Sequence, residues 1–169
     1  MSYLTRSLFL LLIVSTVSTT TFGQKKKSTP ASSSANDESL IKSIIEKETQ
    51  AFFEIDQNEW ASYWAPVSYA FWSFADTTDV NSFSGWENIY NGFDNYFKTS
   101  KASTAKIKRD WLHIKIHGDM AYIRFTQLVD DDSQRPPQAE VRVMEKINGV
   151  WKIVCVSVIA MQKDNQPVR

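Results

Sequence analysis

With 169 residues, 43% of them hydrophobic, and a single cysteine, the chain has the size of one globular domain and cannot close an internal disulfide. The 19 basic and 19 acidic side chains cancel, and because Arg6 and the triplet Lys25, Lys26 and Lys27 lie near the N-terminus, the rest of the chain is net acidic. Nucleic-acid-binding domains usually present a basic face, so this charge balance argues against that class.

The first 23 residues have the pattern of a cleavable signal peptide. Arg6 supplies a positive start, residues 8–14 are apolar, and residues 21–23 end in small side chains at the positions that a signal peptidase reads. The apolar run is shorter than the ~20 residues of a spanning helix, so we expect no transmembrane segment in the mature protein. We therefore predict export to the periplasm or the medium after cleavage near Gly23, with a flexible linker over residues 24–36.

Three helices are predicted in the first half of the domain, which we place at residues 37–163. Residues 40–52 keep a helical spacing of apolar side chains behind an acidic start at Asp37. Trp60 and Trp64 indicate a short second helix, and residues 86–97 form a third, amphipathic one. Two short strands, at 69–74 and 80–83, are expected between the second helix and the third.

The second half of the domain predicts four strands, at residues 106–116, 121–129, 139–147 and 150–161. Asn148-Gly149 is a strong signal for a two-residue hairpin turn. Residues 164–169 would be a C-terminal tail. Helices followed by an antiparallel meander indicate an α+β domain.

Alternation along these strands divides their side chains into two sets. One set is aliphatic and includes Ile114, Ile123, Val141, Val143, Val154 and Val156. The other set mixes aromatic and polar groups and includes Trp111, His113, Arg124, Glu140, Arg142, Cys155 and Ser157. Either the aliphatic set packs on the helices and the mixed set faces water, or the mixed set lines a hollow under the helices and the aliphatic set meets a second subunit.

Three segments of the predicted meander resemble a known family. Residues 117–130 are similar to the AYIR-x-TQ-x-x-D segment of the association domain of calcium/calmodulin-dependent protein kinase II, residues 139–143 resemble its E-x-R-V strand, and residues 148–154 resemble the widespread (D/N)G-x-W-x-I-V ending. The order of elements is also similar to that of the nuclear transport factor 2-like superfamily, which includes SnoaL-type cyclases. The resemblance implies a cone-shaped α+β barrel, with three N-terminal-half helices packed on a strongly curved, mainly antiparallel sheet.

The resemblance also implies a function for two arginines. Arg124 and Arg142 match the arginines that point into the cone and bind small carboxylates, and a guanidinium can donate two parallel hydrogen bonds to such a group. We therefore predict a secreted domain that binds a small carboxylate or an aromatic anion. Internal pairing with Glu48 or Glu140 is the alternative, because buried arginines are almost always paired. The predicted ligand-binding residues are Arg124, Arg142, Trp111, His113, Trp64, Tyr90, Cys155 and Ser157.

The resemblance and the residue pattern also predict which partners, metals and cofactors to expect. The resemblance implies a homodimer through the aliphatic set. Cys and His are too few and too dispersed for a zinc site, and the chain has no glycine-rich phosphate loop, so we expect neither a metal nor a cofactor.

Two other functions are compatible with the sequence. An enzyme of the cyclase, isomerase or hydrolase type would use His113 as a general base together with Glu48 or Glu140. An oligomerisation module would need no ligand.

The chain departs from the family that it resembles at three positions that bear on the enzyme hypothesis. Cys155 and Ser157 stand where many relatives have histidines, and Trp72 stands where ketosteroid isomerases carry a catalytic aspartate. These departures argue against histidine-based chemistry and against isomerase chemistry of that kind.

Overall fold

The computed structural model describes residues 31–103, 105–130 and 135–161. The predicted signal peptide, residues 24–30 of the predicted linker and the C-terminal tail lie outside these residues. Among the described helices, none is long and apolar enough to span a membrane.

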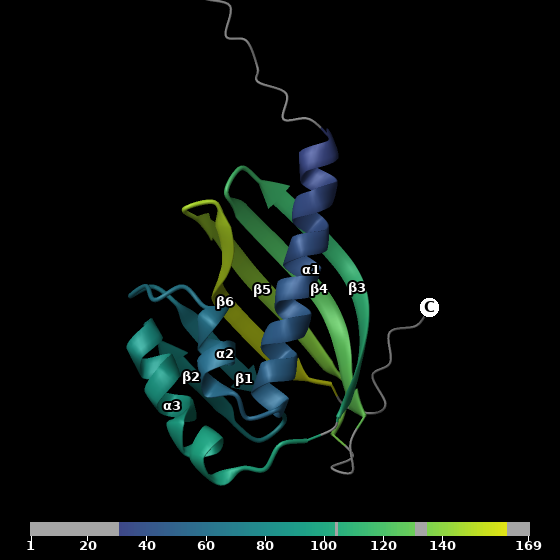
Figure 1. The fold of residues 1–169 in the computed structure, drawn as a ribbon. Helices are drawn as coiled ribbons and strands as arrows, with labels where there is room; N and C mark the ends of the chain where they lie inside the picture. Colours follow the sequence, from purple (N-terminus) through teal and green to yellow (C-terminus); the bar gives the residue numbers. More distant parts are fainter. Residues whose placement is uncertain (1–30, 104, 131–134, 162–169) are drawn as a thin grey trace, which may run out of the picture.

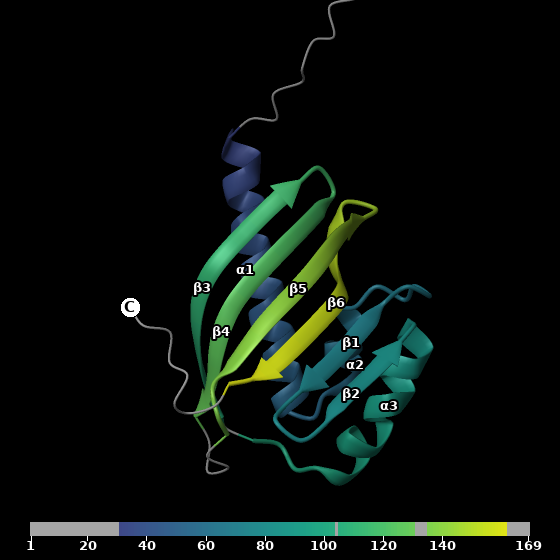
Figure 2. The ribbon, with the colours of Figure 1, turned by 180° about the vertical axis from the view of Figure 1, so that it is seen from behind.

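The domain is α+β, with three helices on a six-stranded mixed sheet (Figure 1). The helices lie on one face of the sheet, and the view from behind shows the opposite face without a described helix on it (Figure 2). The elements in chain order are α1 Ala31–Phe53, α2 Gln57–Ser62, β1 Phe71–Ala75, β2 Val80–Ser84, α3 Trp86–Thr99, β3 Lys106–His117, β4 Met120–Asp130, β5 Gln138–Ile147 and β6 Val150–Ala160.

The strands follow the order β2-β1-β6-β5-β4-β3. β1 runs parallel to β6, and the other four pairs of neighbours are antiparallel, so the sheet is mainly antiparallel as predicted. β2 and β3 are free edges, and the sheet is not strongly curled. The predicted cone-shaped, strongly curved barrel is therefore corrected to an open mixed sheet, because the two edge strands lie at opposite ends and do not pair.

The predicted turns and most element boundaries are close to those observed. Asn148 and Gly149 both have positive φ, 51° and 82°, as the hairpin turn between β5 and β6 requires. Helix α1 begins at Ala31, ahead of the expected start at Asp37. Residues 31–36 contain no glycine or proline, so nothing in their backbone chemistry ends the helix before Asp37.

The hydrophobic core lies between the helices and the inner face of the sheet. α1 contributes Ile41 and Ile45, which have no exposed surface, and the short α2 contributes Trp60, which is 1% exposed. They pack in one cluster with the sheet residues Ile123, Phe125, Met144, Trp151 and Ile153. Removing this much apolar surface from water is the main force that holds helices and sheet together.

A β-bulge in β3 changes the predicted pairing of the first hairpin. The register shifts between Trp111 and His113, so that Trp111, rather than Leu112, lies opposite Phe125. A bulge inserts one extra residue into a strand and therefore exchanges the faces of the residues beyond it. Trp111 consequently faces the helices, whereas Leu112 is 43% exposed.

A second bulge, in β6, has the same effect on the last hairpin. Val143 pairs with Cys155 and Met144 pairs with Ile153, so Val154 is the extra residue. Alternation without a bulge puts Cys155 on the face of Arg142, whereas the observed register puts Val156 opposite Arg142. The predicted face assignment is therefore wrong beyond Ile153.

The predicted aliphatic set is accordingly not a single surface. Ile114, Ile123 and Val156 pack against the core under the helices, and Val154 is buried at the bulge. Val141 and Val143 lie on the opposite face of the sheet, which we call the outer face. The residues proposed for a subunit contact thus belong to both sides of the sheet.

Candidate ligand-binding pocket

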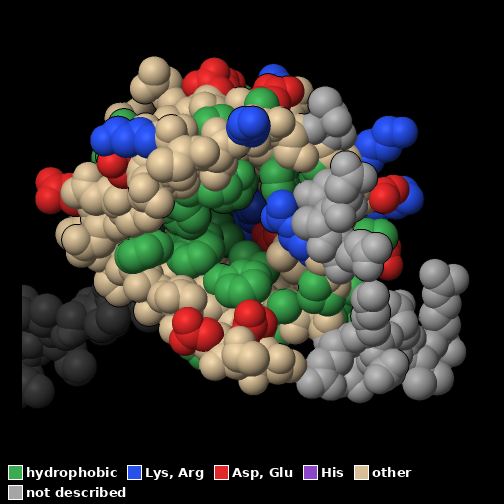
Figure 3. Space-filling view, turned by 90° about the horizontal axis from the view of Figure 1, so that it is seen from below, with side chains coloured by type: hydrophobic (Ala, Val, Ile, Leu, Met, Phe, Trp, Pro, Cys, Tyr) green, Lys and Arg blue, Asp and Glu red, His purple; other side chains and the backbone are tan. Residues whose placement is uncertain are grey.

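A cavity of about 220 Å³ lies between the three helices and the inner face of the sheet. It is smaller than the ~300–1,000 Å³ of pockets for drug-sized molecules and suits a smaller ligand. Figure 3 shows the hollow from the end of the molecule where hydrophobic side chains surround it and charged groups lie in its depth. Its aromatic lining comprises Phe52, Phe53, Trp60, Trp64, Trp72, Phe74 and Phe93, and its polar lining comprises Glu48, Thr49, Gln127, Arg135, Gln138, Glu140 and Arg142.

Strand β5 supplies a row of polar groups to this cavity. Gln138, Glu140 and Arg142 occupy alternate positions, so all three side chains project toward the helices. On the neighbouring β6, Val158 lies opposite Glu140 and Val156 lies opposite Arg142. Charged groups on β5 thus project from a wall that is otherwise aliphatic.

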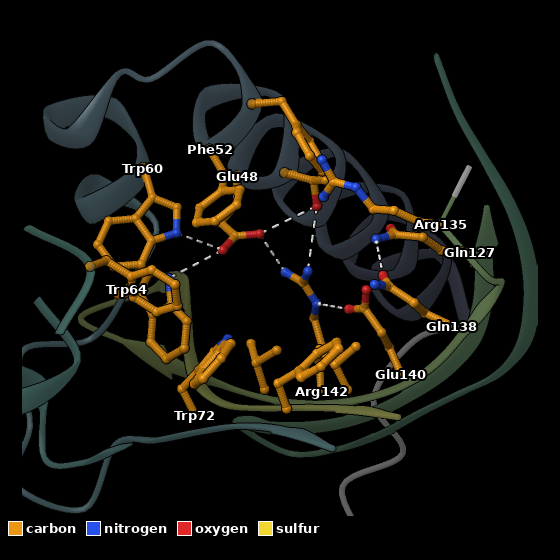
Figure 4. Close-up of a pocket in the computed structure, with 16 residues that line it drawn as sticks. Glu48, Phe52, Trp60, Trp64, Trp72, Gln127, Arg135, Gln138, Glu140 and Arg142 are labelled. Carbon is orange, nitrogen blue, oxygen red and sulfur yellow. Dashed lines mark hydrogen bonds and ion pairs between the residues drawn. The ribbon is translucent and has the colours of Figure 1, made fainter. Parts of the chain in front are cut away.

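Arg142 is the centre of the polar cluster, and its side chain is almost fully buried (Figure 4). Its Nε donates to Glu140 Oε2 at 3.0 Å, its Nη1 to Glu48 Oε2 at 2.6 Å, and its Nη2 to Thr49 Oγ1 at 3.4 Å. Burial alone would lower the pKa of the guanidinium, but the charges and hydrogen bonds of Glu48 and Glu140 outweigh burial and raise it. Arg142 is therefore a permanent cation held in one orientation.

Glu48 is positioned by α1 and by two tryptophans. Its Oε1 accepts hydrogen bonds from Trp60 Nε1 at 2.9 Å and from Trp64 Nε1 at 3.3 Å. Its Oε2 binds Arg142 and accepts from Thr49 Oγ1 at 3.3 Å. Glu48 is 5% exposed, and both of its carboxylate oxygens accept hydrogen bonds, as buried polar groups require.

A second guanidinium, that of Arg109 on β3, completes the cluster. Its Nη2 donates to Thr49 Oγ1 at 2.6 Å, and its guanidinium lies 5.3 Å from the ring centroid of Phe125. Burial, followed by the positive charge of Arg142, lowers the pKa of Arg109 to about 10. The charges of Arg109 and Arg142 balance those of Glu48 and Glu140.

Four of the predicted site residues come together at this cavity: Glu48, Trp64, Glu140 and Arg142. The internal pairing of Arg142 with Glu48 and Glu140, expected as an alternative to ligand binding, is present. Trp111 faces the same side of the sheet but packs on Phe125 at 5.0 Å between ring centroids, outside the cavity. Tyr90 packs on Trp86 and is not part of the lining.

The other predicted site residues lie on the outer face, which corrects the prediction. Arg124 pairs with Val141, one position out of step with Arg142, so its side chain is exposed on the opposite side of the sheet. His113 lies opposite Arg124 and is also exposed. The β6 bulge places Cys155 and Ser157 on this face as well.

Sequence reasoning missed Arg109, Thr49, Gln127 and Gln138. Gln138 continues the polar alternation of Glu140 and Arg142 by one step, and this signal was available. Gln127 continues the buried alternation of Ile123 and Phe125 along β4, so it also had a signal, whereas Arg109 reaches the inner face only through the bulge in β3. In the part of the chain that the structure describes, no three His, Cys, Asp or Glu side chains gather in a way that could hold a metal ion.

The comparison with protein families agrees with this geometry. The model of the calcium/calmodulin-dependent protein kinase II association domain matches residues 37–161. The chain belongs to this family. Its fold is nuclear transport factor 2-like, as the solved structures that resemble it also show. No curated protein matches the chain.

Three solved structures illustrate the likeness. A protein from Thiobacillus denitrificans, described provisionally as an association domain of the same kinase type, is 14% identical, with a TM-score of 0.59 over 72% of this chain and 94% of that one. A nuclear transport factor 2-like protein of unknown function from Shewanella oneidensis is also 14% identical, with a TM-score of 0.59 over 73% and 98% of the two chains. A third, from Novosphingobium aromaticivorans, reaches a TM-score of 0.60 at 14% identity over 79% and 87%. At such identities the likeness shows the fold alone.

Proposed function

We propose that the domain binds a small aromatic carboxylate in this cavity, with Arg142 as the cation that receives the carboxylate. The observation that carries the proposal is a buried guanidinium in the wall of an aromatic-lined cavity that opens at one end of the molecule (Figures 3 and 4). Arg124 has no part in this proposal, because it lies on the outer face.

The charges around Arg142 are compatible with an anion. Arg109 and Arg142 offset Glu48 and Glu140, and Arg135 in the cavity lining adds a positive charge, so an incoming carboxylate meets no net negative charge. The guanidinium has more N–H groups than its three acceptors use, and the bond from Nη2 to Thr49, at 3.4 Å, is the longest of the three. A ligand oxygen would compete with Thr49 for Nη2.

The aromatic lining suits the rest of such a ligand. Phe52, Trp60, Trp72 and Phe93 surround the cavity and contact one another edge-on or tilted, for example Trp72 and Phe93 at 4.8 Å and 87°. Rings in these arrangements offer both faces and edges to a planar guest. An aromatic acid would bury its ring here and keep its charge at the β5 wall.

Titration of the purified protein with benzoate, benzamide and cyclohexanecarboxylate, followed by thermal shift and calorimetry, tests the proposal. We expect benzoate to stabilise the protein saturably and benzamide, its uncharged counterpart, to do so much less. Val158→Phe, which fills the cavity, should abolish the shift, whereas Arg124→Gln on the outer face should preserve it. The proposal fails if no acid binds, or if the filled cavity binds as well as the wild type.

The two alternative functions fare differently. An enzyme that pairs His113 with Glu48 or Glu140 does not fit, because the sheet separates the imidazole from both carboxylates. A module without a ligand is favoured by the internal pairing of Arg142. The same titration tests that alternative, since such a module would bind none of the acids.

We also propose that two copies associate through the outer face and that the protein acts after export. The outer face carries Val141, Val143 and Tyr122, the last 43% exposed, and no described helix covers it (Figure 2). The family description, an association domain, supports the first proposal.

Export is tested by intact mass: secretion from a bacterial host should yield a chain that begins at Gln24.

A further inference from the structure

We propose that Gln127 selects ligands that carry a hydrogen-bond donor at the end remote from their carboxylate, so that the ligand class is the para-hydroxy or para-amino aromatic acids. This inference rests on the proposed function, because it assumes that the carboxylate lies at Arg142. It begins from one unsatisfied atom in the wall of the cavity.

Gln127 lines the cavity and is 5% exposed. Its Nε2 donates to Gln138 Oε1, its cross-strand neighbour, at 3.3 Å, so its Oε1 is left to accept from another group (Figure 4). Its Oε1 is buried and has no hydrogen-bond partner among the described residues. Buried acceptors are rarely left without a donor, so a group that enters the cavity is expected to supply one.

The neighbouring side chains do not supply this donor. Arg109 lies opposite Gln127 on β3, and its Nε is likewise buried without a partner, so no hydrogen bond joins the two side chains. Glu140, next to Gln138 on the same face of β5, can only accept. Arg135, which lies over the ring of Phe53 in the same lining, makes no hydrogen bond to Gln127 Oε1. Phe53 and Phe74 have no polar side-chain atoms.

The spacing of the strands sets the length of the ligand. Gln127 pairs with Gln138, four residues from Arg142 on β5, which is ~13 Å along the strand at ~3.4 Å per residue. The Arg142 side chain extends over part of that distance toward Glu140. A carboxylate at Arg142 and a donor at Gln127 must therefore occupy opposite ends of a small molecule, as they do across a para-substituted ring.

Matched ligands separate this inference from the proposed function. Calorimetry would compare 4-hydroxybenzoate with 4-fluorobenzoate, of similar size without a donor, and with 4-methoxybenzoate, which can only accept. We expect the hydroxy acid to bind about tenfold more tightly than the fluoro acid, the usual effect of one added hydrogen bond to an otherwise unpaired buried atom. Gln127→Met should reduce that ratio to about one while both acids still bind.

Gln57→Met is the control variant. Gln57 also has a buried amide nitrogen without a partner among the described residues, but it does not line the cavity. The substitution should leave the ratio at its wild-type value.

Four results would overturn the inference. Equal binding of the hydroxy and fluoro acids leaves the proposed function intact but removes the role of Gln127. A preference for the methoxy acid shows that the wall donates rather than accepts. If Gln127→Met alters the thermal stability of the free protein but not the ratio of the affinities for the hydroxy and fluoro acids, Gln127 is satisfied internally by Arg109. If none of the acids binds, both proposals fail together.

Discussion

Arg142 joins the two buried carboxylates of the cavity lining. Its guanidinium lies between two carboxylates that are themselves buried, Glu48 at 2.6 Å and Glu140 at 3.0 Å. Removing one partner of a buried ion pair is strongly destabilising, because the remaining charges lose their compensation in a medium that solvates them poorly. This cost exceeds what the intact cluster contributes, since desolvation offsets much of its Coulomb energy.

We therefore expect Arg142→Met to lower the free energy of unfolding by about 3–5 kcal/mol, as measured by urea denaturation. Arg124→Met, one cross-strand step away on the exposed outer face, is the matched control and should change it by less than about 0.5 kcal/mol. Adding Glu48→Gln and Glu140→Gln to Arg142→Met should recover a large part of the loss. Equal effects of the two arginine substitutions would contradict the assignment of Arg142 to the buried side.

At this scale the sequence identified only part of the site. Glu140 and Arg142 were correctly placed on one face because they are two positions apart on a strand, and Glu48 was a correct candidate partner. Arg124 was misplaced because alternation fixes faces within a hairpin, whereas the relation between two hairpins depends on how β4 pairs with β5. Two bulged positions, which have no signature in a single sequence, then reversed Trp111, Cys155 and Ser157.

At the scale of elements, Asp37 links α1 to the β5–β6 hairpin through hydrogen bonds. Its carboxylate accepts from Lys146 Nζ at 2.8 Å and from Trp151 Nε1 at 3.0 Å. The hydrogen bonds from Lys146 and Trp151 lower the pKa of Asp37 in the folded protein. A depressed carboxyl pKa contributes stability above the unfolded value of ~3.9, and the contribution is lost as the pH falls through the folded pKa.

Asp37→Asn should therefore cost about 0.5–1 kcal/mol at pH 7, because the pair is partly exposed, and this cost should shrink as the pH falls below ~3.9. Denaturant unfolding of both proteins between pH 2.5 and pH 7 measures this difference. Glu38→Gln, in the more exposed pair with Lys42 on the same helix, is the control. A penalty for Asp37→Asn that stays constant across the pH range would show that Asp37 acts through packing and not through its charge.

The order of elements could be predicted because each one has a local cause. Helical spacing, the Asn148-Gly149 turn and strand alternation act within a few residues. The parallel pairing of β1 with β6 and the two open edges at β2 and β3 depend on contacts between distant segments. A strongly curled cone was expected from the resemblance alone, and local sequence patterns could not have corrected it.

At the scale of the whole molecule, the two faces of the sheet have different roles in our proposals. The inner face holds the cavity, and the outer face offers apolar side chains for a second copy. Tyr122 lies opposite Val143 on the outer face and is 43% exposed, and Val143 in turn pairs with Cys155. Burial raises the pKa of the Cys155 thiol, so Cys155 should already react slowly with alkylating reagents in a single copy.

Association of two copies should slow the alkylation of Cys155 further, which makes this thiol a reporter of the interface. We expect light scattering to give the mass of a dimer for the wild type and of a monomer for Tyr122→Asp, with faster alkylation of Cys155 in the variant. Leu40→Asp is the matched control, because Leu40 is 46% exposed on α1, on the helical side of the sheet. The two positions are exposed to a similar degree in a single copy. A difference in mass between the Tyr122→Asp and Leu40→Asp variants can therefore come only from a contact on the outer face. A monomeric wild type, or a dimer that Tyr122→Asp leaves intact, would show that the outer face is not the interface.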